Sequence, residues 1–296
     1  MKNVPASLVR QGHPDHKKLS AVAEEILQRA GGLDALKIEV PKLLRDCIDD
    51  VIQTPKTGRR SYEELEKTEK TYIGTRVEIM LRALLSLPRG RLDTVVAGYD
   101  ADIKHTMGNN WMIPSEAVNH ICILVAADEA QARCYLGLVV AKPEYLTAGG
   151  NRDAKKSLSK VGFSHILWLL CGEPYPQNFW RTLSPKIANE IFSGASGNDR
   201  VVALFRAVQG TPVSRDVVDA VARQKDFTRR TRADKGHGAR DRLADEGILL
   251  LCGTLKPQKD LIARFGLHLN SRSDYISYQV TTKEEKAAAR KAGFKL

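Results

Sequence analysis

A proline-containing segment divides this 296-residue chain and constrains its fold more than any other feature. The segment Gly172–Asn178 contains two prolines, which cannot continue the apolar helical pattern that we expect over Ser164–Cys171. The charge changes at the same place. Residues 1–180 carry 24 Lys and Arg against 22 Asp and Glu, whereas residues 181–296 carry 22 against 13. We therefore predict one domain over residues 1–171, a linker over residues 172–180 and a second domain over residues 181–296.

Composition excludes membrane-spanning, disordered and disulfide-rich classes of protein. The hydrophobic content of 43% is enough to build cores, and the longest apolar run, Ile121–Ala127, is far shorter than the ~20 residues of a membrane span. The five cysteines are odd in number and scattered, without a Cys-x-x-Cys pair. We expect a soluble, cytoplasmic protein with reduced thiols. Its net charge of +11 is compatible with an anionic partner, most commonly nucleic acid.

The N-terminal domain has the pattern of helices followed by a sheet. Apolar residues at helical spacing predict helices over Lys18–Ala30, Pro41–Ile52 and Thr75–Leu85. Ser61 and Glu64 have the spacing of a capping box that opens a charged helical stretch. Strand patterns follow over Asp93–Lys104, Asn119–Ala127 and Arg133–Ala141. The expected class is α/β (α+β), with a helix-flanked sheet that contains a hairpin.

Three ionisable side chains alternate with apolar ones in the first of these strand patterns. In an extended chain, Asp100, Asp102 and Lys104 point to one face. Two carboxylates with a lysine two residues after one of them suit Mg²⁺-dependent phosphodiester hydrolysis, because carboxylate oxygens hold the metal and the ammonium orients or deprotonates the attacking water. A solvated strand face with ordinary ion pairs explains the same spacing, so the pattern alone leaves both interpretations open.

The context of Asp102 and Lys104 distinguishes them from other acid-x-Lys pairs. Such pairs also begin at Asp15, Asp153 and Glu284, outside any strand pattern. Asp102 has a second acid, Asp93, nine residues earlier and a helical Glu78 upstream. Two histidines nearby are less informative. His105 is expected on the opposite strand face from Lys104, and His120 is expected to be a hydrogen-bonded histidine rather than a metal ligand.

The C-terminal domain has a helix-turn-helix pattern. Asp199–Val208 is amphipathic, Gly210–Pro212 breaks it, and Ser214 begins a second helix that runs to Gln224. A strand-like run over Gly247–Cys252 follows a basic stretch, which suits a mainly helical winged-helix or related helix-turn-helix domain. The basic side chains expected to face DNA are Arg229, Arg230, Arg232, Arg240 and Arg242. A solvated basic helix is the alternative.

Two further segments have weaker sequence signals. Thr147–Lys156 resembles a glycine turn entering a helix, where Arg152, Lys155 and Lys156 could contact phosphates. A solvated helix start explains the same residues. The Ala-, Lys- and Glu-rich tail from Lys283 predicts an exposed helix or a frayed end.

A series of short blocks in order resembles the NaeI-type restriction endonucleases, over about Thr54 to Leu251. These blocks are Gly58-Arg59, Leu65–Thr71, Gly74-Thr75, Val77–Ile79, Ala97-Gly98, Asp102-x-Lys104, Trp111-Met112, Pro114, His120–Cys122, Gly137-Leu138 and Asn151–Asp153. The sequence departs from the family pattern at Tyr99–Ala101, where Asp100 has no counterpart, and after Cys252.

The resemblance implies an N-terminal endonuclease domain of the PD-(D/E)xK kind and a C-terminal DNA-binding domain with a helix-turn-helix core. It implies Mg²⁺-dependent cleavage of double-stranded DNA by a homodimer, with a second DNA copy as effector. By position, the catalytic residues are Glu78, Asp93, Asp102 and Lys104, and the three acids hold Mg²⁺. A GC-rich palindrome is the first target to test, and a cognate DNA methyltransferase is the expected functional partner.

Two other classes of function also fit parts of this sequence. A non-catalytic DNA-binding regulator would keep the helix-turn-helix and an inactive N-terminal domain, but a relic is expected to lose at least one member of the catalytic set. A repair or nicking endonuclease would share the metal site. Stoichiometry separates the latter from a restriction enzyme, because cutting both strands of a palindrome suits a two-fold dimer.

Overall fold

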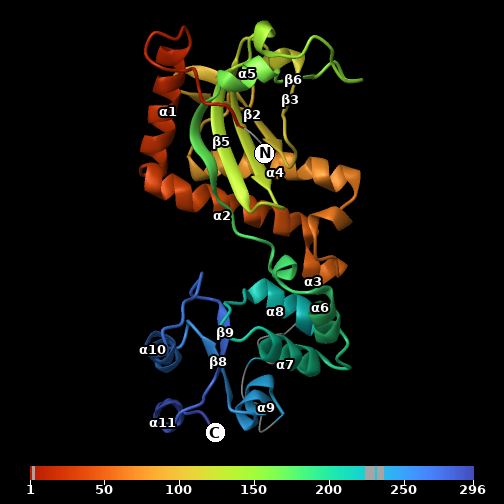
Figure 1. The fold of residues 1–296 in the computed structure, drawn as a ribbon, viewed down its shortest axis with the longest axis vertical. Helices are drawn as coiled ribbons and strands as arrows, with labels where there is room; N and C mark the ends of the chain where they lie inside the picture. The colour runs from red at the N-terminus through yellow and green to blue at the C-terminus, as the bar shows by residue number, and fades with distance from the viewer. Residues whose placement is uncertain (2–3, 224–230, 232–236) are drawn as a thin grey trace. The chain divides into compact units, whose positions relative to one another are not determined.

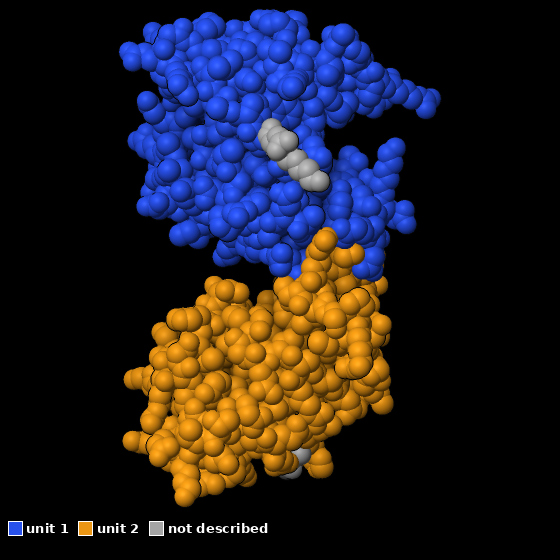
Figure 2. Space-filling model, viewed as in Figure 1, with its two compact units in different colours: residues 1–52, 62–178 blue, residues 53–61, 179–296 orange. Residues whose placement is uncertain are grey.

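The chain forms two compact units in a computed structural model that describes Met1 and residues 4–223, 231 and 237–296 (Figures 1 and 2). One unit contains residues 1–52 and 62–178, and the other contains residues 53–61 and 179–296. The short helix α3 (Thr54–Thr57) therefore belongs to the second unit although it lies early in the sequence. Within the described residues, no helix has the length and hydropathy needed to cross a membrane.

The N-terminal unit is built on a mixed five-stranded sheet with the order β1-β2-β4-β5-β7. Its strands are β1 (Thr94–Val96), β2 (Tyr99–Thr106), β4 (Ile121–Asp128), β5 (Arg133–Val140) and β7 (Leu167–Pro174). Strands β2 and β4 pair in parallel, and the other neighbours pair antiparallel. The predicted hairpin is confirmed, because β4 and β5 are consecutive antiparallel neighbours.

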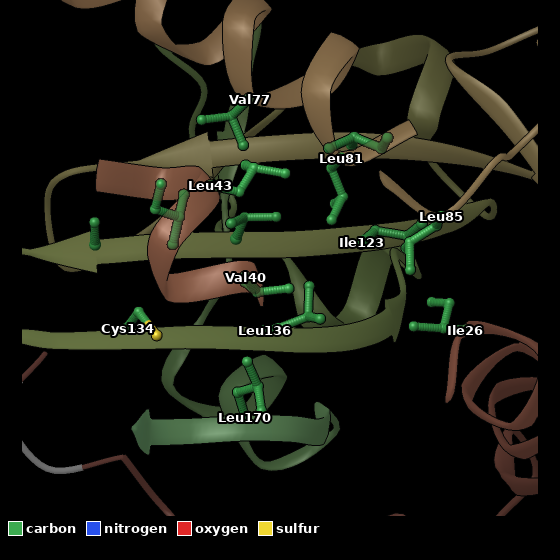
Figure 3. Packing of buried hydrophobic residues seen from close by; sticks show 14 of the residues in the cluster. Ile26, Val40, Leu43, Val77, Leu81, Leu85, Ile123, Cys134, Leu136 and Leu170 are labelled. Atoms are coloured by element: carbon green, nitrogen blue, oxygen red, sulfur yellow. The ribbon is translucent and has the colours of Figure 1, made fainter. Parts of the chain in front are cut away.

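Three helices cover one face of this sheet, α1 (His16–Ala30), α2 (Leu33–Ile52) and α4 (Lys67–Leu84) (Figure 1). Figure 3 shows Leu43 of α2 and Val77 and Leu81 of α4 near Ile123 and Leu136 of the sheet. All are buried, and each such aliphatic side chain stabilises the fold by roughly 1.5–3 kcal/mol. This face holds the larger hydrophobic core of the unit.

The opposite face of the sheet is also covered, which explains why β4 is apolar along its whole length. Cys122 and Leu124 of β4 pack there with Trp111, whose Nε1 donates to the Val125 carbonyl at 2.7 Å. The covering elements include β3 (Met112–Ile113), β6 (Lys156–Ser157) and α5 (Lys160–Ser164). A strand buried on both faces loses the alternating pattern of a half-exposed one.

Two predicted helix starts in this unit are wrong. Helix α2 begins at Leu33 and continues through Pro41, because the fully buried Leu36 and Val40 anchor its first turns in the core. That packing outweighs the hydrogen bond that proline removes, a loss of ~3 kcal/mol. The capping box of α4 joins Glu66 and Glu69, with the Glu69 carboxylate accepting the Glu66 N–H at 2.9 Å, rather than Ser61 and Glu64.

Two predicted helical segments are also wrong. The residues from Leu167 to Cys171 lie in β7, because an apolar run of this length fits strand or helix and β5 offers a pairing edge. The segment that ends at Lys156 forms a turn and then β6. Asn151 Oδ1 accepts the N–H groups of Asp153 and Lys155 at 3.0 and 2.9 Å, which replaces the hydrogen bonds of a helix start.

The C-terminal unit packs helices around a two-stranded antiparallel sheet. The predicted pair of helices corresponds to α7 (Gly197–Ala207) and α8 (Arg215–Ala222), and Ser214 caps α8 by accepting the Val217 N–H at 3.3 Å. The other main elements are α6 (Pro185–Phe192), α9 (Ala239–Asp245), β8 (Ile248–Cys252), α10 (Lys256–Arg264), β9 (Tyr275–Gln279) and α11 (Lys283–Lys291). The tail is a helix, as predicted, but its Ala288 and Ala289 are buried against Phe294 and their neighbours.

Replacing Gly74 by Ala is expected to stabilise the N-terminal unit by about 0.5–1 kcal/mol, because glycine inside a helix loses more chain entropy on folding than alanine. An added Cβ would meet nothing within 4 Å. Urea unfolding followed by circular dichroism checks the midpoint. The matched control is Gly162→Ala in α5, where a Cβ would lie 2.1 Å from the Tyr145 carbonyl oxygen, so this variant is expected to unfold at lower urea. A lower midpoint for Gly74→Ala would contradict the prediction.

Candidate active site

The two acids nine residues apart are brought together by the β1–β2 hairpin. Thr94 pairs with Ala101, so Asp93, immediately before β1, lies beside Asp102 of β2. The Ile103 N–H donates to Asp93 Oδ2 at 2.7 Å and fixes that carboxylate against the strand. The spacing that the sequence shows is therefore the spacing that closes this hairpin.

Lys104 completes the group on the same face of β2. Its Nζ lies 2.6 Å from Asp102 Oδ1 and 3.8 Å from Asp93 Oδ2. One ammonium thus contacts both carboxylates, and its side chain keeps a quarter of its surface exposed to solvent. The lysine neutralises part of the charge that two neighbouring carboxylates would otherwise concentrate.

Asp102 is the most perturbed acid of the group. The residue is 4% exposed, and its Oδ2 is buried without a hydrogen-bond partner in the described part of the chain. Burial, followed by the neighbouring Asp93, raises the pKa of Asp102 to about 7, although Lys104 opposes the shift. A buried oxygen without a partner costs about 1–3 kcal/mol. A proton shared with Asp93 satisfies it while Asp102 is protonated, and a cation would take the place of that proton. Binding such a cation requires the carboxyl group to lose its proton.

Helix α4 adds Glu78 to the group. Burial, and then the Asp93 carboxylate, raises the pKa of Glu78, while Arg82, Lys104 and Arg89 lower it. Arg82 lies one turn after Glu78, with Nη1 3.6 Å from Glu78 Oε1, and donates from the same atom to the Asp93 carbonyl at 3.0 Å. The structure therefore brings together Glu78, Asp93, Asp102 and Lys104. Sequence reasoning missed Arg82, for which the i,i+4 spacing from Glu78 was the available signal.

The donor set fits a hard divalent cation. Among the described residues, no group of three or more His, Cys, Asp and Glu side chains is already arranged to hold a metal ion. Mg²⁺ does not need one, because it keeps several waters and is commonly bound by one or two carboxylates. Asp102 uses Oδ1 for Lys104 and leaves Oδ2 unpartnered beside Asp93. These two acids, with Glu78 close by, are the residues that could hold the ion.

The two histidines differ from this group in their surroundings. His105 is half-buried with its Nε2 inaccessible to solvent, and this desolvation lowers its pKa to about 4, so it stays neutral at physiological pH. His120 Nε2 lies 3.0 Å from Arg91 Nη2, and because a guanidinium can only donate, the imidazole nitrogen accepts. This contact agrees with the expectation that His120 is a hydrogen-bonded histidine.

The predicted DNA-contacting residues lie apart from the acidic group in the sequence and have varied surroundings. Arg152 and Lys155 are exposed in the turn before β6, and Lys156 is half-buried in that strand. In the C-terminal unit, Arg240 Nη2 lies 3.5 Å from Gln258 Oε1, and Arg242 Nη1 lies 2.8 Å from Asp199 Oδ1. The predicted Arg229, Arg230 and Arg232 lie outside the described residues.

Most of the chain is similar to known proteins. A family described as restriction endonuclease NaeI matches residues 33–293. The type II restriction enzyme NaeI of Lentzea aerocolonigenes is 36% identical over 253 residues, which cover 82% of this chain and 78% of that protein. The class is thus that of the restriction endonucleases, hydrolases that cleave DNA. The chain belongs to the NaeI restriction endonuclease family.

The family match also extends the resemblance that the sequence showed. It begins before Thr54 and runs past Leu251 to residue 293, so the region after Cys252, which was expected to depart from the family, lies within the match. Glu78, Asp93, Asp102 and Lys104 all fall inside it.

Proposed function

We propose that this endonuclease hydrolyses phosphodiester bonds of double-stranded DNA at a specific site with Mg²⁺, and that Glu78, Asp93, Asp102 and Lys104 carry out the reaction. The observation that carries the proposal is the buried Asp102, which has a lysine on one carboxylate oxygen and no described partner on the other. A solvated strand face would not bury this acid to 4% exposure. A metal site explains why the chain tolerates the loss of stability that comes from burying this carboxylate.

Each side chain has a role that follows from its place. Asp93 and Asp102, with Glu78, would hold the ion, which when bound supplies charge neutralisation at the phosphate and polarises a water. Lys104, within reach of both carboxylates, orients the attacking water and stabilises negative charge on the phosphate. Arg82 fixes the spacing between Glu78 and the Asp93 backbone. The leaving group is a 3′ oxygen.

We assign a different function to each of the two units. The N-terminal unit is the endonuclease domain of the PD-(D/E)xK kind, and the C-terminal unit is a DNA-binding domain of the winged-helix or helix-turn-helix kind. Residues 181–296 hold most of the excess positive charge, which attracts a polyanion. Arg152, Lys155, Lys156, Arg240 and Arg242 are proposed DNA contacts, as are the three arginines outside the described residues.

The remaining features of the proposal come from the family. They are a homodimer that cuts both strands of a GC-rich palindrome, a second DNA copy as effector and a cognate methyltransferase that protects the host. We place the reaction in the cytoplasm, where the cell's own DNA needs that protection and the five free cysteines stay reduced.

Digestion of a large unmethylated DNA with Mg²⁺ and with EDTA tests the proposal. We expect discrete fragments with Mg²⁺, whose ends give the recognition site, and no cleavage with EDTA. Smeared products would favour a nuclease without site preference. Nicked circles from a plasmid, without linear product, would favour a nicking enzyme, and binding without cleavage in any divalent metal would favour a regulator.

A further inference from the structure

An exposed arginine is held in place next to the acidic group by two residues to which the proposed reaction gives no role. Arg91 Nη2 donates to His120 Nε2 at 3.0 Å, and Arg91 Nε lies 3.9 Å from Asp100 Oδ2. The Arg91 backbone N–H also donates to Asp100 Oδ1 at 2.8 Å. A long side chain that would otherwise sample many rotamers is thus anchored at its backbone and at its guanidinium.

The sheet places this cluster on the same face as Asp102. Asp100 lies two residues before Asp102 on β2, about 7 Å away at the usual strand rise, and side chains two apart share a face. The parallel pairing of Ala101 with Ile121 sets His120 beside Asp100. Arg91 itself lies two residues before Asp93. The guanidinium is therefore a near neighbour of the proposed metal site.

The loop that carries Arg91 is shaped around Asp100. A Cβ at Gly90 would lie 2.6 Å from both Asp100 Oδ1 and the Thr94 carbonyl oxygen, so only glycine fits while these contacts persist. Asp100 contacts Arg91 through both carboxylate oxygens, whereas the described ion pairs of Lys104 are with Asp93 and Asp102. Asp100 therefore holds Arg91 and the loop around Gly90, and it is not one of the proposed metal ligands.

The guanidinium remains available to a ligand although it is anchored. The Arg91 side chain is 70% exposed, whereas that of Asp100 is 30% exposed. The described contacts engage Nη2 and approach Nε, which leaves donors of the planar fork that match phosphate oxygens. Pre-ordering lowers the entropy that such a contact costs on binding.

We propose that Arg91 binds a DNA backbone phosphate next to the one that is cleaved, and that Asp100 and His120 are positioning residues for it. The inference rests on the proposed nuclease function and adds a DNA contact to it. A phosphate contact carries no sequence information, so Arg91 contributes equally to cognate and other DNA.

Binding of a short duplex of arbitrary sequence in EDTA, measured over a series of salt concentrations, tests the contact without cleavage. Arg91→Gln is expected to weaken binding at low salt roughly tenfold, in line with a lost charge-assisted hydrogen bond. The slope of log K against log salt is expected to become less steep by about 0.9, the value for one phosphate contact.

The control is Arg133→Gln, which removes the same charge from an exposed arginine of the same unit. In the antiparallel β4–β5 ladder, the backbone of Arg133 lies opposite that of Asp128, at the other end of β4 from His120. The Arg133 Nη1 donates to the Gly172 carbonyl. This variant is expected to bind as the parent does. If Arg91→Gln and Arg133→Gln bind equally at all salt concentrations, the proposal is overturned.

The positioning role is tested by Asp100→Asn and His120→Ala. The Asn carbonyl oxygen can still accept the Arg91 N–H, so the loop is kept while the charge is lost. Each variant is expected to lose binding, but neither should weaken Arg91→Gln further, because coupled residues are not additive. Additive losses would contradict the positioning role.

Failure of the proposed nuclease function would be seen in a different experiment, as a wild-type protein that binds the duplex yet cuts no DNA with Mg²⁺.

Discussion

Replacing Asp102 by Asn is expected to slow DNA cleavage by at least about 10²- to 10³-fold, the loss typical of removing one group that stabilises transition-state charge. Asn keeps the size of the side chain and an oxygen that can contact Lys104, but it loses the charge that a metal ion requires. Lys104→Ala is expected to have an effect of similar size. Single-turnover cleavage of plasmid DNA measures the rate, and duplex binding in EDTA should change by only a few-fold.

The control for this prediction comes from another acid-x-Lys pair in the same chain. Glu284 and Lys286 have the same spacing on α11, where both are exposed. Glu284→Gln is expected to leave the cleavage rate unchanged. Cleavage by Asp102→Asn at the parental rate would show that the buried acid is not part of the site.

A second large effect is expected in stability, at a buried ion pair far from the acidic group in sequence. Arg45 of α2 and Glu129 of the β4–β5 turn are each 7% exposed, and Arg45 Nη1 lies 2.6 Å from Glu129 Oε1. Tyr175 Oη donates to the same carboxylate oxygen at 3.0 Å. Glu129→Ala removes the buried partner of the guanidinium, which keeps only the exposed Asp49, and it removes the acceptor of the Tyr175 hydroxyl. We therefore expect a loss of about 2–3 kcal/mol in the unfolding free energy of the N-terminal unit.

Urea unfolding followed by tryptophan fluorescence measures the loss of unfolding free energy. A variant of Asp49, the other carboxylate partner of Arg45, serves as the control. Asp49 lies 2.7 Å from Arg45 Nη2, but 48% of its side chain is exposed, so solvent screens the pair. Asp49→Asn is expected to cost less than about 1 kcal/mol. Equal losses in the two variants would contradict the assignment of the large effect to burial.

Much of the acidic group could be predicted from sequence because its parts are close along the chain. Asp93 and Asp102 are only nine residues apart, and Lys104 follows from strand periodicity. The single extended segment expected over Asp93–Lys104 is wrong, however, because β1 and β2 form a hairpin within it. The two compact units divide close to the prolines and the change of charge, but the linker was expected to begin within what is β7, and residues 53–61, expected in the first domain, belong to the second unit. Glu78 was visible as a helical acid upstream, but its role as a catalytic residue required the family resemblance, because nothing local connects it to the later strand.

The features that sequence reasoning missed depend on pairing between distant segments. His120 comes beside Asp100 only through the parallel β2–β4 pairing, and parallel neighbours leave no turn signal in the sequence. Glu129 meets Arg45 across 84 positions of the chain. The wrong start at Pro41 has a similar cause, because the local penalty of proline was visible and the burial of Leu36 and Val40 in the assembled core was not.

We propose that Asp93 and Asp102 hold a divalent ion at the phosphate that is cleaved. A crystal structure of the protein with cleaved duplex DNA and Mg²⁺ tests it most directly. We predict an ion whose ligands include an oxygen of Asp93 and an oxygen of Asp102, each at about 2.0–2.1 Å, and a DNA phosphate oxygen. The metal role of these two acids would be ruled out by DNA bound with its cleaved phosphate away from Asp102 and with no ion between the two carboxylates.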